Sequence, residues 1–261
     1  MRLKATRELW LPLLLAPLFI GLWQLVIALV PPDWRIFLPG PLQILRAFAS
    51  RSDELLPAML LTGGGAATGF LLAIAFSTCV AALLSLSRWV RAGLFPYLML
   101  LQLTPIVVIA PMLVLWVGAG FRSVTTISFL ICVFPMIVNT TQGLLSVDRQ
   151  HAELFRLARA SRWQELRFLK LPSALPFFFT GLRIAATLAP IGAVVGDFTA
   201  GDSAHAGLGI LAILYSANFR YPELFATVLA TACLGFLFAG SSALLSRLFL
   251  GPWHDSRNRK E

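Results

Sequence analysis

The sequence predicts an all-α membrane protein with six transmembrane helices, and three features of its 261 residues support this. Hydrophobic residues make up 58% of the chain and charged residues 13%, against about 45–50% and about 25% in soluble domains. The mean hydropathy of +0.81 leaves too little polar surface to cover a water-soluble globule. Six apolar runs reach the roughly 20 residues that a helix needs to cross the bilayer. This composition excludes a soluble enzyme and a disordered chain.

The first apolar run extends from Leu9 to about Val30 and follows a basic tail. A signal peptide has an apolar core of only about 7–15 residues and ends in a small-residue cleavage site. This run is longer and ends at Pro31-Pro32, so we predict a retained anchor helix. Residues at helical spacing in the following outer segment predict a short interfacial helix, with an irregular connector as the alternative. They are Leu42, Leu45, Arg46 and Ala49. Anchor and outer segment together form a unit over 1–58.

The other five runs form a predicted permeation core over 59–250, followed by a tail at 251–261. They extend over about Leu60–Leu86, Leu94–Val117, Val124–Leu145, about Ala174–Thr199 and about Leu224–Leu248. Proline and glycine inside these runs are tolerated because neighbouring helices satisfy the freed backbone groups and small residues allow close approach. The runs do not alternate as β-barrel strands would.

Lys and Arg residues near the helix ends predict the orientation in the membrane. If the amino terminus is cytoplasmic, the cytoplasmic segments hold 15 of the 21 Lys and Arg residues and the outer segments hold 5. The remaining one, Arg183, lies inside the fifth run. Both termini are therefore expected in the cytoplasm. The same clustering accounts for the net charge of +9 without nucleic acid, which binds basic residues that line one face. The separate Cys79, Cys132 and Cys233 are read as small buried hydrophobic residues.

The cytoplasmic loop 146–172 is the most informative segment. On a helix, Leu154, Leu157 and Ala158 share one face, and Phe155 projects beside Arg159. A second short helix is expected over Arg162–Leu169, ended by Pro172. Two short helices with an aromatic side chain and charges of both signs suit docking into a groove on another protein. They equally suit a surface helix on anionic lipid, and the residues alone leave both readings open.

The loop resembles that of a known family. It reads Glu153-Leu-Phe, three residues, then Arg159 and Ala160, and later Leu171-Pro172 with Pro176. This pattern resembles the cytoplasmic "EAA" loop of ABC-importer permeases, in which Glu-Ala-Ala is followed by three residues, Gly and later Leu-Pro. Gly181–Arg183 and Gly207–Gly209 also match, over about Leu60 to Leu250. The chain resembles the nitrate/sulfonate/taurine branch of binding-protein-dependent permeases.

The resemblance implies a type I ABC-importer permease fold in the bacterial inner membrane. It implies a homodimer in membrane lipid, two ATPase subunits and a periplasmic solute-binding protein. The ATPases would use ATP and Mg, and this chain lacks the G-x-x-x-x-G-K-[ST] phosphate loop. We therefore expect no catalytic residue, metal or cofactor in it. The implied ATPase-coupling residues are Glu153, Leu154, Phe155, Arg156, Leu157, Arg159, Ala160, Ser161, Arg162 and Trp163.

Two positions depart from the family motif. Arg159 stands where the motif has glycine, and Phe155 stands where it has alanine. Glycine allows a tight turn between the two short helices, whereas Arg159 must make that turn with a Cβ. We expect a different bend or a deeper insertion of Phe155 into its partner, and no loss of coupling.

Polar residues inside the apolar runs are candidates for the translocation path. Asp197, late in the fifth run, is expected to line the outer part of the path, and a pairing with Arg220 is the alternative. The others could form a gate or hydrogen-bond between helices. They are Gln102, Thr104 and Pro105 in the third run, and Asn139 and Gln142 on one face of the fourth.

A membrane-embedded enzyme is the rival class. It needs paired catalytic groups at similar depth, and the sequence offers none. The stretch Gly201–Gly209 is expected to be a flexible outer loop, near the docked binding protein by resemblance, and His205 a solvated histidine rather than a ligand.

The substrate is less well defined. The run Phe178–Asp197 is similar to the sub-branch that moves thiamine-precursor pyrimidines or riboflavin, with Asp197 in place of an expected Glu. Alkanesulfonates, taurine and nitrate are the alternatives.

Overall fold

The computed structural model describes residues 2–200 and 206–254, with side chains described over 15–199 and 206–250. Every element in these ranges is helical. In chain order they are α1 (Arg2–Leu29), η1 (Pro32–Phe37), α2 (Pro41–Ser50), α3 (Ser52–Leu86), α4 (Arg88–Leu103), α5 (Ile106–Val117), α6 (Phe121–Leu145), α7 (Arg149–Leu157), α8 (Arg162–Glu165), η2 (Leu166–Lys170), α9 (Leu171–Ala200), α10 (Leu208–Ala217) and α11 (Tyr221–His254).

Four described helices are long and apolar enough to cross a membrane: α3, α6, the helix containing α9, and α11. The helices α4 and α5 pass that test only as a pair, bent by 98°. The third run is therefore not one continuous span, because Pro105 lacks an N–H and forces Thr104 into an extended conformation with ψ 119°. In α1 (Arg2–Leu29), the side chains are described only from Leu15 on, and the apolar part Leu15–Leu29 is below the length of this test. Up to five candidate spans are thus present in the described residues.

The core lies where α3, α6 and α9 pack together. Glycines allow the close approach, since a Cβ at Gly69 would lie 2.6 Å from the Thr125 carbonyl oxygen and one at Gly196 would lie 2.7 Å from the Val124 Cα. Hydroxyl groups join the helices as well. Ser128 donates to the Ala189 carbonyl at 3.0 Å, and Ser77 donates to the Val133 carbonyl at 2.9 Å.

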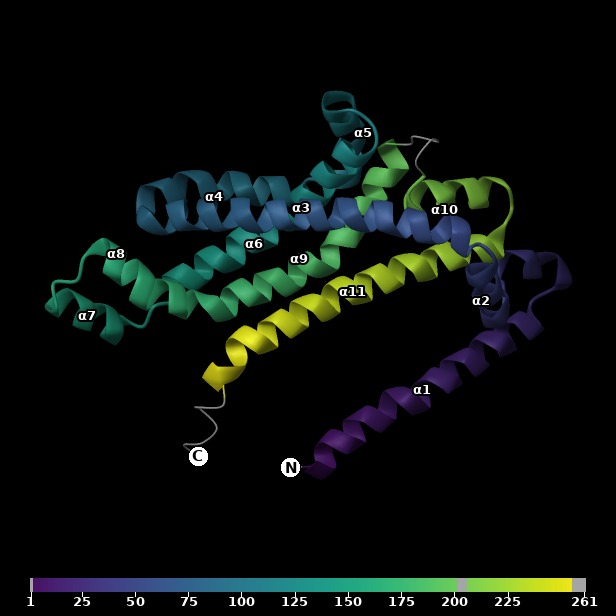
Figure 1. Ribbon diagram of the computed structural model, residues 1–261, viewed down its shortest axis with the longest axis horizontal. Coiled ribbons are helices and arrows are strands. Elements are labelled where there is room, and N and C mark those ends of the chain that lie inside the picture. The colour runs from purple at the N-terminus through teal and green to yellow at the C-terminus, as the bar shows by residue number, and fades with distance from the viewer. Residues whose placement is uncertain (1, 201–205, 255–261) are drawn as a thin grey trace.

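The molecule is elongated, and short helices lie at both of its ends (Figure 1). The helices α7 and α8 lie at one end, and α2 and α10 lie at the other. The expected helix in the outer segment is confirmed as α2, but its buried residues are Ile44 and Ala47. The four residues that we expected to define its face are all exposed.

Two expected features of the loops were wrong. Pro172 does not end a helix, because the π-helical turn η2 carries α8 directly into α9. In this turn the Leu171 N–H reaches back to the Leu166 carbonyl, so the wider helix accommodates the proline ring. Leu208 and Gly209 belong to α10 rather than to a loop, whereas residues 201–205, with His205, lie outside the described residues.

The three cysteines do not share one environment. Cys132 is buried, as we expected, and its thiol lies 3.3 Å from the Ala185 carbonyl oxygen. Cys79 is exposed and Cys233 is half-buried, so burial was predicted correctly for one residue only.

Candidate functional site

The first short helix of the loop, α7, begins at an N-cap residue. The carboxylate of Asp148 accepts a hydrogen bond from the Gln150 N–H at 3.0 Å, which satisfies one of the free donors at the helix start. Glu153 pairs with Arg149 at 3.4 Å along the same helix. Leu154 is 60% exposed and Leu157 is 81% exposed. The described side chains therefore leave an apolar stripe of α7 uncovered.

The turn after α7 passes through Arg159, whose φ is +51°. The Arg159 N–H bonds to the Arg156 carbonyl and the Ala160 N–H to the Phe155 carbonyl, each at 3.0 Å. These two bonds define a Schellman motif, which usually has glycine in the left-handed position. Arg159 therefore makes this turn with a Cβ in a strained, left-handed backbone, and whether the loop bends differently from that of its relatives stays a prediction.

The second short helix, α8, begins with a capping box. The Ser161 hydroxyl accepts from the Gln164 N–H at 3.2 Å, and the Gln164 side chain accepts from the Ser161 N–H at 2.8 Å. Lys170 pairs with Glu165 at 3.1 Å where α8 passes into η2. Trp163 is 66% exposed on the outer side of this helix. Hydrogen bonds therefore cap the N-termini of both α7 and α8. Through η2, α8 is continuous with α9.

The ten predicted coupling residues all lie on this short stretch. Eight are exposed, and Phe155 and Ala160 are half-buried. We define residues 149–170 as the coupling segment and keep that name below.

At the other end of the molecule, Asp197 lies in a buried hydrogen-bond network. The Thr62 hydroxyl donates to Asp197 Oδ2 at 2.6 Å, and the Gly209 N–H donates to the same oxygen at 3.4 Å. The Leu208 N–H donates to the Thr62 hydroxyl at 2.9 Å. Only 3% of Asp197 is exposed, and a Cβ on Gly207 would overlap its carboxylate. The network fastens α10 to α3 and α9.

Arg220 does not take part in that network. It pairs with Glu223 at 2.8 Å, and this bond raises the pKa of its guanidinium. It also lies over the ring of Tyr215 at 4.9 Å from the centroid. The Tyr215 hydroxyl donates to Glu54 Oε2 at 2.6 Å; burial, and then this bond, raise the pKa of Tyr215. The predicted alternative, a pair between Asp197 and Arg220, is absent from the described contacts.

Residues 55–250 match the family model described as "Binding-protein-dependent transport system inner membrane component". The chain belongs to this family. It is therefore a multi-pass permease component of the inner membrane, works with a binding protein and an ATPase, and is not itself catalytic. The matched range agrees with the extent that the sequence predicted.

Several curated relatives of this permease span most of its length. It is 32% identical to the formylaminopyrimidine transport permease protein ThiX of Halalkalibacterium halodurans, over 93% of this chain and 95% of that one. It is 36% identical to the riboflavin transport system permease protein RibX of Chloroflexus aurantiacus, over 62% and 60%. The putative aliphatic sulfonates transport permease protein SsuC of Escherichia coli is 29% identical, over 93% and 91%.

A solved structure of an amino acid ABC transporter matches with a TM-score of 0.60 at 16% identity. The match covers 77% of this chain and 94% of that chain. At this identity it supports the permease fold alone.

The other polar candidates lie apart from Asp197. The Thr104 hydroxyl and the Asn139 amide bond to carbonyls of their own helices, at 3.0 Å and 2.8 Å. Gln102 and Pro105 are exposed at the break between α4 and α5. Gln142 lines a cavity of about 410 Å³ with Arg88, Arg91 and Pro96. None of these described contacts joins two helices, and whether they form a gate stays a prediction.

Sequence reasoning missed three residues that the structure brings into view. Thr62 lies 135 positions from Asp197 and stands in an apolar run, so no local signal marked it. Tyr215 belongs to a helix that hydropathy did not detect. Ser128 makes a hydrogen bond between α6 and α9. We had named Asn139 and Gln142, also on α6, as candidates for such a bond.

Proposed function

We propose that this permease imports a small nitrogen heterocycle of the thiamine-precursor pyrimidine or riboflavin type. Two relatives named for such solutes, ThiX and RibX, are 32% and 36% identical to it. The alternative is an alkanesulfonate, taurine or nitrate, favoured by the 29% identity to SsuC over 93% of the chain. Measuring the affinity of the cognate binding protein for both solute classes tests the proposal, because that protein selects the cargo.

We further propose that the coupling segment transmits the closure of an ATPase dimer to the membrane helices. The observation that supports this is the unbroken path from α8 through η2 into α9. A displacement of α8 therefore moves α9, which packs closely against α6 in the core. The exposed Leu154, Leu157 and Trp163 offer the apolar and aromatic anchors that dominate protein interfaces.

The proposed membrane arrangement has six spans, with the coupling segment and both termini in the cytoplasm. The threefold excess of Lys and Arg in the segments assigned to the inside supports this orientation. In Figure 1, α1 runs toward the α2 end and α11 runs away from it, so α1 begins and α11 ends away from α2. In this arrangement α2 and α10 face the binding protein, and two copies of the chain enclose the path.

In the proposed cycle, ATP binding closes the ATPases and draws the two coupling segments together. The helices then rock and expose the path outward, where the binding protein releases its solute. Such coupling needs contacts that differ between the two states. The candidate path residues are Gln102, Thr104, Pro105, Asn139, Gln142 and Asp197.

Replacing Glu153 with Lys tests the coupling proposal. The change breaks the pair with Arg149 and reverses one charge on the docking face, so ATP hydrolysis should continue while ATP-driven uptake falls about tenfold or more. Arg149→Gln, which breaks the same pair but leaves the Glu153 charge in place, serves as the matched control and should retain most of the uptake. Unchanged uptake in Glu153→Lys, with normal membrane insertion, contradicts the docking role.

A further inference from the structure

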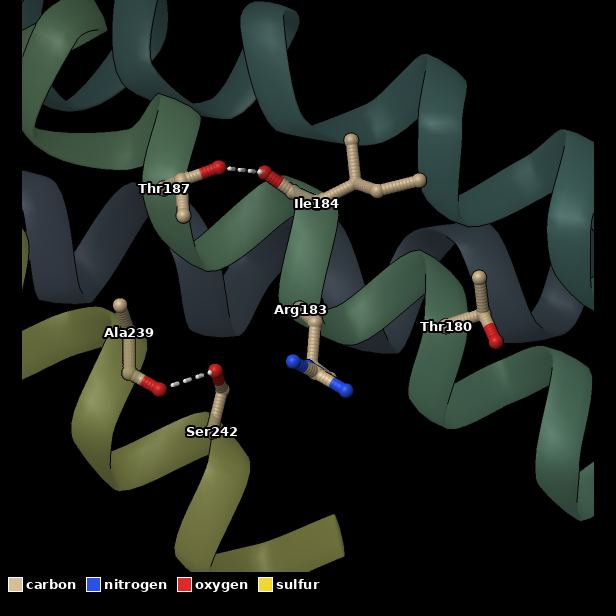
Figure 2. Close-up of a pocket in the computed structure, with 6 residues that line it drawn as sticks. All are labelled: Thr180, Arg183, Ile184, Thr187, Ala239 and Ser242. Atoms are coloured by element: carbon tan, nitrogen blue, oxygen red, sulfur yellow. Dashed lines mark hydrogen bonds between the residues drawn. The ribbon is translucent and has the colours of Figure 1, made fainter. Parts of the chain in front are cut away.

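A cavity of about 380 Å³ lies between α9 and α11, away from the coupling segment and from Asp197. Its lining is Thr180, Arg183, Ile184, Thr187, Ala239 and Ser242. Figure 2 shows the Arg183 guanidinium pointing into the space between the two helices, with Ser242 on the facing helix. The volume lies in the range of small-molecule sites, which is about 300–1,000 Å³.

Arg183 lies near the middle of a membrane-spanning helix. It follows Leu171 by about 18 Å and precedes Thr199 by about 24 Å, at a rise of about 1.5 Å per residue. No ion pair among the described residues includes it. A charge at this depth costs roughly 2.5–3.5 kcal/mol on insertion scales, so such residues usually face a cavity and serve transport. Packing alone gives no reason for a guanidinium here.

The hydroxyl groups of the cavity are already committed as donors. Thr180 donates to the Pro176 carbonyl at 2.9 Å, Thr187 to the Ile184 carbonyl at 2.8 Å, and Ser242 to the Ala239 carbonyl at 2.9 Å. Each hydroxyl has a single hydrogen, so its oxygen faces a ligand only as an acceptor. The guanidinium has donors and no acceptor. The wall therefore offers donors from one residue and acceptors from three others.

We propose that this cavity is a transit site for a nitrogen heterocycle that carries both an acceptor and an N–H donor. Arg183 holds the acceptor, and the hydroxyl oxygens of Thr180, Thr187 and Ser242 select for the donor. A ring nitrogen or carbonyl of the solute accepts from the guanidinium, while an exocyclic amino or amide group donates to the hydroxyl oxygens. A sulfonate or nitrate would satisfy the guanidinium but has no hydrogen for those oxygens. This assignment rests on the heterocycle proposal above and adds the cavity in which the permease itself recognises the solute.

The test uses the complete permease–ATPase complex in lipid nanodiscs without the binding protein. Equilibrium binding of labelled 4-amino-2-methylpyrimidine is compared with that of labelled ethanesulfonate. Arg183→Met should weaken pyrimidine binding about 10- to 100-fold, the loss expected for a hydrogen bond to a charged group. Arg183→Gln keeps N–H donors and should retain most of it, and Ser242→Ala should weaken it severalfold. Thr78→Val, whose hydroxyl bonds its own helix on α3, should leave it unchanged.

Two results overturn the assignment. One is pyrimidine binding that Arg183→Met leaves unaltered in a complex that elutes normally. The other is tighter binding of ethanesulfonate than of the pyrimidine, together with an equal loss of ethanesulfonate binding in Arg183→Gln and Arg183→Met. That result identifies an anion site. Coupling of ATP hydrolysis to uptake and the affinity of the binding protein are measured separately, so the failure of this site is distinguishable from the failure of the proposed function.

Discussion

The Thr62–Asp197 network makes Thr62→Val a sharp test of how the outer end of the permease is held. Valine has nearly the shape of threonine, so the change removes the hydroxyl and leaves no cavity. The hydroxyl donates to Asp197 Oδ2 at 2.6 Å and accepts from the Leu208 N–H at 2.9 Å, and Thr62 is fully buried. Both partners would be left buried with one bond fewer.

The expected loss follows from those two bonds. A hydrogen bond to a charged group contributes about 1.5–3 kcal/mol, and an orphaned buried N–H costs about 1–3 kcal/mol. Together they give about 2.5–6 kcal/mol. At about 2–4 °C per kcal/mol for chains of 150–250 residues, the midpoint of thermal unfolding in detergent should fall by about 5–24 °C.

Thr68→Val is the matched control on the same helix. The Thr68 hydroxyl is only half-buried and donates to the Gly64 carbonyl of its own helix at 2.8 Å. Its loss should cost under about 1 kcal/mol, since that carbonyl keeps its helical N–H partner. Equal midpoints for the two variants would refute the view that this network fastens α10 to α3 and α9.

Three further changes have defined outcomes. Arg159→Gly relieves a left-handed backbone at φ +51°, although glycine loses more chain entropy on folding. The thermal midpoint should rise by the equivalent of about 0.5–1 kcal/mol, with uptake retained. A lower midpoint argues against backbone strain at Arg159. Gly207→Ala brings a Cβ into the Asp197 carboxylate, whereas the Cβ of Gly235→Ala meets no atom within 4 Å, so limited proteolysis near α10 should increase in the first variant only. Tyr215→Phe loses the 2.6 Å bond to Glu54 and should lower the midpoint by the equivalent of about 1–2 kcal/mol; an unchanged midpoint would show that the bond adds nothing.

Hydropathy was enough to predict most of the membrane helices, because burial in lipid requires long apolar runs whatever their partners. It counted the third run as one span, whereas the structure breaks it at Pro105, one of the residues that we had named as candidates for a gate. It did not detect α10, which has only ten residues and is too short to read as a span. Pro172 was misread because the π-helical turn that accommodates it leaves no mark in the local sequence.

Some residues of the candidate sites were predictable from the sequence, and others were not. The resemblance identified Arg159 as the position where glycine is usual, and the positive φ there confirms the physical reason. Asp197 was recognised as unusual, but its partner Thr62 could not be inferred, because it comes from a helix 135 positions earlier. The helix of the outer segment was predicted correctly, but the face that packs on the core, with Ile44 and Ala47, could not be inferred, because hydrophobic side chains on a membrane protein can face lipid as well as the core.

The most direct test of the central claim is cross-linking from the coupling segment in native membranes. A photoreactive residue at position 157, where leucine is 81% exposed, is compared with one at position 42 on α2, where leucine is 56% exposed. The account predicts a covalent adduct between position 157 and an ATPase subunit, with a yield that changes when ATP is added, and no ATPase adduct from position 42. An ATPase adduct from position 42, or none from position 157 in a complex that still transports, would contradict it.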